Sequence, residues 1–297
     1  MAYTLRAPDD LDALVALIAT CQQDPAQRCL HCDQTPAGLR AEILALDPPW
    51  QAAFLGVYSE LDSGSELVAV LGCDCDFEMG RGWLHGPFAQ DKDLQSLFKL
   101  LFDGWEQRLP ATITRLSNYL DQANQRGLDF HLQRGFQAKG LFFILLAQAQ
   151  PTQRPASVRS FLPSDAEMLC QLHASTFPAA WLSGPAMIAH RDETHAVLIA
   201  WEQGQRVGYI RLSQHLELPE AEIEYLAVDP AWRGRGIGRK LLQAGLDWIF
   251  AERGLPTAVL NVSADNAKAL ELYLSVGFEV KERAIALDLW RNTHGSP

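Results

Sequence analysis

The chain has neither a long hydrophobic run nor a surplus of positive charge. The apolar segment LFFILLA at residues 141–147 predicts a buried strand, and no run approaches the roughly 20 residues that a membrane-spanning helix needs. The 25 Lys and Arg are outnumbered by 36 Asp and Glu, and the net charge is −11. We therefore expect no membrane partner and no broad nucleic-acid surface.

A basic segment before the first apolar stretch is also missing. Asp9, Asp10 and Asp12 stand where a secretory signal would carry Lys or Arg. This pattern predicts a cytoplasmic protein.

Cysteines are few, and their spacing is poor for a metal site. Of the six, Cys29 and Cys32 flank His31, and Cys73 and Cys75 form a C-x-C pair. A four-thiolate zinc site is the alternative to free thiols. The C-x-C pair is a weak knuckle and lies far from the first pair, so we expect no metal.

The chain contains neither G-x-x-x-x-G-K-[ST] nor G-x-G-x-x-G, which excludes the common ATP and dinucleotide loops. It has instead RGRGIG at residues 233–238, between an alternating strand pattern and an amphipathic helix pattern. The first N–H groups of a helix have no internal partner and favour an anion, and glycine allows close approach of the backbone. The turn predicts a phosphate site; the alternative is a plain strand-to-helix connection.

The sequence repeats itself once. NQRGLDFHLQRGF from Asn124 and NAKALELYLSVGF from Asn266 share Asn, Leu and Gly-Phe at an offset of 142 (266 − 124). The same offset places 226–230 on 84–88. A single repeat of about half the chain indicates two copies of one domain. We place the domains at residues 1–150 and 155–297, joined by the proline-containing segment 148–157.

The second half mixes strand and helix patterns without strict alternation, which predicts an α/β fold with a mixed, mostly antiparallel sheet flanked by helices. Two strands joined at Gly204 precede a third that ends at Pro230. In this third strand, alternation places Glu222, Glu224 and Leu226 on one face and Ile223 and Tyr225 on the other.

The segment VDPAWRGRGIG (228–238) resembles the acetyl-CoA signature of the GCN5-related N-acetyltransferases, the GNAT superfamily. Its pattern Arg/Gln-x-x-Gly-x-Gly/Ala is met by Arg233, Gly236 and Gly238. Asn266, Tyr273 and Gly277-Phe278 match the second segment of the family. The resemblance covers roughly residues 155–290. It implies two tandem GNAT-like domains and an acetyl-CoA-dependent N-acetyltransferase, with a non-catalytic CoA-ester sensor or protein-interaction module as the alternative.

The first half departs from the pattern. At the 142 offset the glycine turn becomes residues 91–96, DKDLQS, and Tyr273 becomes His131. Two carboxylates in place of two arginines would repel a pyrophosphate. We predict that this degenerate copy does not use acetyl-CoA and has a structural or substrate-covering role.

The resemblance assigns roles to residues of the second half. Tyr273 is the candidate acid for the leaving thiolate, and Glu224 and Glu222 are the candidate bases. Some relatives carry a Glu on the next strand, where this chain has Asn261. The residues implied to bind the cofactor are Leu226, Ala227, Val228, Arg233, Gly234, Arg235, Gly236, Ile237, Gly238, Arg239, Asn266 and Tyr273.

The acceptor is expected to be a small-molecule primary amine that attacks the thioester directly. Phe177 and Trp181, in the loop HASTFPAAWLSGP, are candidate pocket residues together with Glu222. Both aromatics are equally compatible with ordinary core packing. The protein is expected to be a monomer or a homodimer.

Overall fold

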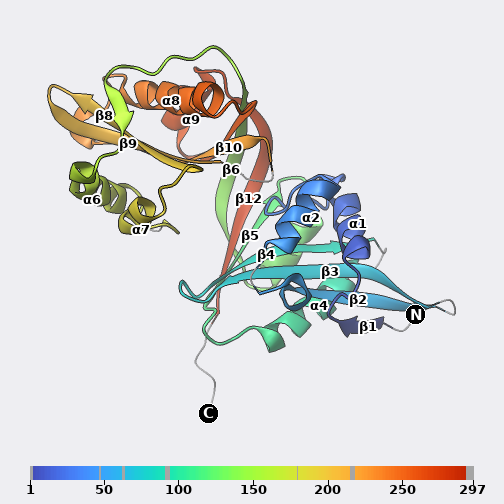
Figure 1. The fold of residues 1–297 in the computed structure, drawn as a ribbon. Coiled ribbons are helices and arrows are strands. Elements are labelled where there is room, and N and C mark those ends of the chain that lie inside the picture. The colour runs from blue at the N-terminus through green and yellow to red at the C-terminus, as the bar shows by residue number, and fades with distance from the viewer. Residues whose placement is uncertain are drawn as a thin grey trace. The chain divides into compact units, whose positions relative to one another are not determined.

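The structure is a computed structural model that describes residues 3–46, 48–61, 64–90, 94–178, 180–214 and 218–291. It forms two compact units (Figure 1). The second unit comprises Phe143–Glu282, and the first comprises the described residues on either side of it. Residues 91–93, part of the segment predicted to lack a phosphate turn, lie outside the described residues.

The first unit is a mostly antiparallel sheet with helices on it. Its strands run in the order β1-β2-β3-β4-β5, followed by β12. The β4–β5 pair is parallel, and the β1–β2, β2–β3, β3–β4 and β5–β12 pairs are antiparallel. Its elements are β1 (Tyr3–Arg6), α1 (Leu11–Gln22), α2 (Pro36–Leu44), α3 (Trp50–Ala53), β2 (Phe54–Leu61), β3 (Gly64–Asp76), β4 (Arg81–Ala89), α4 (Leu94–Arg108), β5 (Arg115–Asp121), α5 (Gln125–Gln133) and β6 (Gln137–Gln148).

The second unit repeats this plan, with strand order β6-β11-β10-β9-β8-β7. The β10–β11 pair is parallel, and the β9–β10, β8–β9 and β7–β8 pairs are antiparallel. The predicted mixed, mostly antiparallel sheet flanked by helices is confirmed. Its elements are β7 (Val158–Ser160), α6 (Ala166–Thr176), α7 (Gly184–Ala189), β8 (His195–Glu202), β9 (Gln205–Gln214), β10 (Glu220–Val228), α8 (Ile237–Asp247), β11 (Thr257–Ser263), α9 (Ala267–Leu274) and β12 (Glu279–Trp290).

Two hydrophobic cores lie on opposite faces of the second sheet. Residues of α8 and α9 pack with Ala221, Ile223 and Leu226 on one face. Residues of α6 and α7 pack with Tyr225 and Ala227 on the other. Figure 1 shows the two helix pairs on either side of β8–β10.

The predicted alternation of side chains along β10 is wrong beyond Ile223, because the strand contains a β-bulge. Ile223 pairs with Leu212, but Tyr225 pairs with the next residue of β9, so Glu224 is an extra residue. An extra residue reverses which face the following side chains occupy. Leu226 therefore packs toward α8, and Tyr225 joins the face on which Glu222 lies.

The offset of 142 between the two copies does not hold for every strand. β5 and β11 match at the offset of 142, since Arg115 and Thr257 open the two parallel pairings. Their partners Arg81 and Glu220 differ by 139. The second unit thus has three more residues between the paired strands, and Glu222 corresponds to Trp83. In the second unit, the segment that joins β10 to α8 is eight residues long (229–236) and contains Gly234 and Gly236 of the glycine turn.

Two strands contribute to both units. β6 has its first six residues in the first unit and the remainder in the second, and β12 crosses in the opposite direction after Glu282. The predicted linker at 148–157 therefore lies inside the second unit, and the closing strand of the chain belongs largely to the first.

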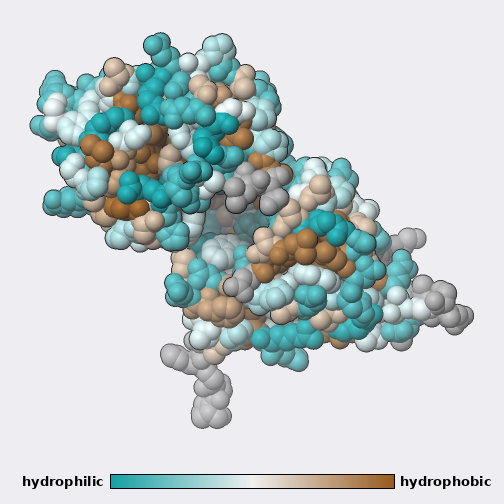
Figure 2. Space-filling view, in the orientation of Figure 1, coloured by the Kyte–Doolittle hydropathy of each residue, from teal (hydrophilic) through white to brown (hydrophobic). Residues whose placement is uncertain are grey.

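Apolar side chains are exposed in small groups. On the face drawn in Figure 2, hydrophobic residues form limited patches within a largely hydrophilic surface. Among the described helices, none combines the length and apolar character that crossing a bilayer requires.

Candidate functional site

The glycine turn has the backbone that a bare anion loop needs. Gly234 and Gly236 have φ of 75° and 77°, in the left-handed region that favours glycine. A Cβ atom at either position would have no atom within 4 Å, so the space beside the turn is open. Gly236 caps α8 without a side-chain hydrogen bond, which leaves the first N–H groups of the helix for a ligand.

The third glycine has a different role. A Cβ atom at Gly238 would lie 3.2 Å from Leu272 of α9, tighter than most such contacts. Gly238 therefore allows α8 to pack closely against α9, while Gly234 and Gly236 shape the turn.

Three arginines surround the turn, and each has a contact of its own. Arg233 donates from Nε to the Val228 carbonyl at 3.0 Å, and Arg235 lies over the Trp232 ring at 4.8 Å. Arg239 donates to Ser275, with 2.7 Å from Nη2 to Oγ. All three are exposed, so positive charge is concentrated at the N-terminus of α8.

The parallel pairing of β10 and β11 ends early. It covers only Glu220–Glu222 opposite Thr257–Val259, after which the strands diverge toward the glycine turn. Among the described residues, no main-chain hydrogen bond from another segment joins β10 to β11 beyond this point. We call the region between the diverging ends the β10–β11 opening.

Glu222 lies beside this opening, on the α6–α7 face. Asn261 donates to its Oε1 at 3.4 Å. Burial, reinforced by the charge of Glu224, raises the pKa of Glu222 to about 7. This carboxyl can therefore take up or release a proton near neutral pH.

Glu224 has a different environment. It forms a buried ion pair with Arg211, with 3.1 Å between Oε2 and Nε, and both side chains are less than 10% exposed. Arg211 also donates to the His190 carbonyl at 3.3 Å. The Glu224 carboxylate is therefore engaged by the Arg211 guanidinium within the protein.

Tyr273 lies on the other face of the sheet, packed with the α8–α9 core and edge-on to Phe278. Burial raises its pKa to about 12, so the phenol stays protonated at neutral pH. Glu222 and Tyr273 therefore approach the strands from opposite faces.

Asn266, a predicted cofactor contact, is the N-cap of α9, where its Oδ1 accepts from the Ala269 N–H at 3.3 Å. The side-chain nitrogen has no hydrogen bond to any described residue. Asn124 caps α5 in the same way. The repeated Asn is thus the N-cap of a helix in both units. Neither Asp265 nor Ser263 caps α9.

Aromatic side chains from α6 and its following loop cover the bulge. The Phe177 and Tyr225 rings are 5.1 Å apart, and His173 stands edge-on to Tyr225 at 4.9 Å. Trp181 is 51% exposed. The structure thus brings Phe177 to the face of Glu222, with Trp181 at the surface of the same loop.

The sequence alone gave no signal for Arg211, Tyr209 or Tyr225 at this site. His173, which has no metal spacing, donates from Nε2 to the Leu182 carbonyl at 2.7 Å, and its Nδ1 lies 2.5 Å from the Tyr209 hydroxyl. Their grouping depends on strand pairing and on the bulge, which local periodicity does not contain.

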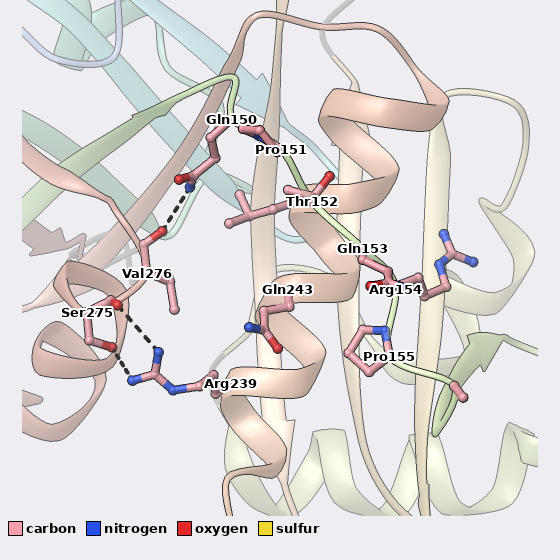
Figure 3. A pocket seen from close by; sticks show the side chains of 12 residues that line it. Gln150, Pro151, Thr152, Gln153, Arg154, Pro155, Arg239, Gln243, Ser275 and Val276 are labelled. Atoms are coloured by element: carbon pink, nitrogen blue, oxygen red, sulfur yellow. Dashed lines mark hydrogen bonds between the residues drawn. The ribbon is translucent and has the colours of Figure 1, made fainter.

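A polar groove of about 640 Å³ runs along α8, lined by Arg239, Gln243 and Leu246 of this helix (Figure 3). The segment 150–156 forms one wall, and Arg239, Gln243 and Ser275 lie along the other side. The buried Thr152 hydroxyl has no hydrogen-bond partner in the structure. Such a groove can take a polar, charged group.

The cysteines do not form a metal cluster in the part of the chain that the structure describes. Cys32 lies 3.3 Å from His85 Nδ1, and the thiols of Cys73 and Cys75 are 3.6 Å apart. All six cysteines are free thiols.

Comparison with known families and curated proteins gives several matches. A family model described as "Acetyltransferase (GNAT) family" matches residues 166–278. The N-alpha-acetyltransferase RimI of Mycobacterium tuberculosis is 37% identical over 133 residues, which cover 42% of this chain and 79% of that protein. The mycothiol acetyltransferase of Amycolatopsis mediterranei is 29% identical over 170 residues, and the match spans only 56% of its length.

Solved structures match over nearly the whole chain. A GCN5-related N-acetyltransferase from Sphaerobacter thermophilus has a TM-score of 0.72 at 19% identity and covers 97% of this chain and 95% of its own. A tandem GNAT protein from the clavulanic acid biosynthesis pathway has a TM-score of 0.62 at 14% identity, with full coverage of both chains. At these identities the likeness concerns the fold.

Proposed function

The chain belongs to the GNAT acetyltransferase family, and from this premise we propose that its second unit transfers an acetyl group from acetyl-CoA to a primary amine of a small acceptor. The observation that carries the proposal is the placement of Glu222 and Tyr273 on opposite faces of the β10–β11 opening, which leads to the glycine turn. An acyl donor lying in the opening would have an acid on one side and a base on the other.

The residues present fit acetyl-CoA. The space beside Gly234 and Gly236, where a Cβ atom would lie, is open. The free N–H groups of Ile237–Arg239 at the start of α8 suit a pyrophosphate. The backbone of Leu226–Val228 would pair with the pantetheine arm, and the free Asn266 amide nitrogen would donate to it. The groove beside Arg239 would accept the nucleotide end.

Acetyl-CoA supplies, when bound, an activated thioester. Glu222 is the proposed base, because its raised pKa lets it accept the proton of an incoming ammonium near neutral pH. Glu224 is reassigned to a positioning role, because its carboxylate is committed to Arg211. A backbone N–H near Val228 is the proposed donor to the developing oxyanion.

Tyr273 is the proposed acid. Its phenol remains protonated and can donate a hydrogen bond to the departing sulfur. Its partly buried setting on α9 keeps this donor away from bulk water.

The acceptor side is the α6–α7 face. The carboxylate of Glu222 attracts an ammonium group, and Phe177 and Trp181 offer apolar surface for the substituent next to it. The N-alpha-acetyltransferase among the relatives supports an amine as the acceptor class.

Calorimetric titration with acetyl-CoA tests the proposal. We expect one equivalent to bind to the wild type and no binding to Gly236→Glu, whose side chain would occupy the ligand space. Gly204→Glu is the matched control, because Gly204 also has φ of 77° and open space but lies in the β8–β9 turn. Equal loss of binding in both variants would contradict a cofactor role for the turn. Release of CoA thiol with a panel of amines then separates an enzyme from a sensor.

A further inference from the structure

The first unit has the same diverging pair of strands, but a segment of the chain itself lies between them. β4 and β5 pair only over Arg81–Trp83 and Arg115–Ser117, then separate as β10 and β11 do. The turn of residues 28–32, RCLHC, occupies the region between their ends. We call it the RCLHC turn.

Main-chain hydrogen bonds attach the RCLHC turn to β5. The Leu30 N–H donates to the Tyr119 carbonyl at 2.6 Å, and the Asp121 N–H donates to the Arg28 carbonyl at 3.2 Å. Cys29 forms an antiparallel bridge with Leu120. The turn therefore pairs with the strand edge as a short extra strand would.

The same turn contacts β4. His31 Nδ1 lies 3.1 Å from the Leu84 carbonyl, and the Cys29 thiol lies 3.7 Å from the same oxygen. Asn118 of β5 donates across the gap to the Gly86 carbonyl at 2.6 Å. Both edges of the gap are thus joined by residues of the chain.

A buried glutamine fixes the conformation of the turn. Gln22, the last residue of α1, is 0% exposed. Its Oε1 accepts from the Cys29 N–H at 2.8 Å, and its Nε2 donates to the carbonyls of Cys29 and Cys32, each at 2.8 Å. Because these groups are satisfied internally, the turn is an integral part of the core.

In the first unit, the residues equivalent to the proposed cofactor-binding residues form hydrogen bonds with the RCLHC turn or with β5. Asn124, the equivalent of Asn266, donates from Nδ2 to the Arg28 carbonyl at 3.2 Å. His131, the equivalent of Tyr273, is fully buried with Nε2 2.9 Å from Asn118 Nδ2. At the β4 offset, Leu226 corresponds to Pro87, which has no N–H to offer.

We propose that the RCLHC turn is an intramolecular substitute for the pantetheine arm, so that the first unit keeps its strands apart around its own chain and binds no acetyl-CoA. The comparison of the two units rests on the proposed function of the second. Whether the RCLHC turn fills the gap between β4 and β5 is tested independently of that function.

Amide hydrogen exchange measures the occupancy directly. The N–H groups of Cys29, Leu30 and Asp121 are expected to be protected in the wild type, and saturating acetyl-CoA is expected to leave their rates unchanged while slowing exchange in 226–239. Gln22→Met keeps the side-chain volume but removes the amide, and should raise exchange at these three positions at least tenfold. Gln23→Met, at the exposed neighbour, is the matched control and should leave them unchanged.

Three results would overturn the inference. These are slower exchange at Asp121 with acetyl-CoA, a second bound equivalent that survives in Gly236→Glu, and unchanged exchange in Gln22→Met. If Gln22→Met does not fold, the wild-type comparison with and without acetyl-CoA decides. Failure of acetyl-CoA to bind at all would end the proposed function, whereas the inference about the turn would still stand or fall on the exchange at Asp121.

Discussion

Two carboxylates on one strand have different chemistry because their neighbours differ. Glu222 lies beside a neutral amide, and burial raises its pKa. Glu224, two positions on, is held by the guanidinium of Arg211. Because the pKa of Glu222 is raised to about 7, the proposed acetyl-transfer reaction should depend on pH in this range.

We expect kcat/KM to rise with pH through an apparent pKa of about 7, because Glu222 must be deprotonated to act as a base. In Glu222→Gln this limb should disappear, and the rate at pH 8 should fall by roughly 100-fold or more. Initial rates of CoA release between pH 5.5 and 9, roughly the range in which such a group titrates, provide the measurement.

Glu220→Gln is the control, since Glu220 lies on the same strand two residues earlier and should keep the limb. Tyr273→Phe should lower the plateau while leaving the position of the limb unchanged. A limb that persists in Glu222→Gln would assign the base to another group.

The same N-cap hydrogen bond, from a repeated Asn, begins one helix in each unit. Asn266 and Asn124 cap α9 and α5 with the same side-chain oxygen. Asn124 is buried, and its nitrogen is also engaged by the Arg28 carbonyl, whereas the nitrogen of the exposed Asn266 is available. We therefore expect substitution of Asn124 to affect stability alone, and substitution of Asn266 to affect both stability and ligand binding.

We expect Asn266→Ala to lower the free energy of unfolding by about 1 kcal/mol, as loss of an N-cap does. It should also weaken acetyl-CoA binding. Asn124→Ala should cost more stability, because it removes both the N-cap of α5 and a hydrogen bond to the Arg28 carbonyl, but should not change acetyl-CoA affinity. Chemical denaturation and calorimetry on both variants make the comparison; weaker binding in Asn124→Ala would contradict the assignment of the site to the second unit.

The elements that could be predicted from sequence are those whose signals are local. The hairpin at Gly204 and the glycine turn both follow from turn residues and short-range patterns. The bulge at Glu224 could not be predicted, because it is defined by pairing with Leu212 and Arg211 on another strand. The RCLHC turn was suggestive only of a metal or free thiols, since its main-chain partners lie about 90 residues away.

Across the whole molecule, the two units differ in the histidines whose pKa is lowered by full or partial burial. His31, His85 and His131 in the first unit have pKa values that burial lowers to about 4, 3 and 4. Each ring stays neutral in the folded state but binds a proton readily once unfolded. The free energy of unfolding is therefore fully retained above about pH 6.5 and falls as the pH decreases toward 4.

We expect acid to unfold the first unit before the second, although the second also contains one such group, His173. For His131, which is fully buried, the loss is on the order of 3 kcal/mol at the acid end. Pulse proteolysis at pH 7 and pH 4.5, with cleavage sites mapped by mass spectrometry, should show cuts in 3–142 at the lower pH. Simultaneous cleavage of both units would contradict this.

The two-copy organisation could be predicted from the repeat, but the sharing of β6 and β12 could not. A strand that crosses from one unit to the other has the same alternating pattern as one that does not. Only the pairing of β12 with β5 reveals that the end of the chain completes the first unit.

This sharing reverses the usual order of events on the ribosome, where the N-terminal domain generally folds first. The second unit is one continuous segment, Phe143–Glu282, and all of it is synthesised before the last part of β12. The first unit lacks the strand that pairs with β5 until residues 284–290 have been synthesised. The segment made first is therefore the last to reach its final structure, and during synthesis the edge of β5 is left without its partner.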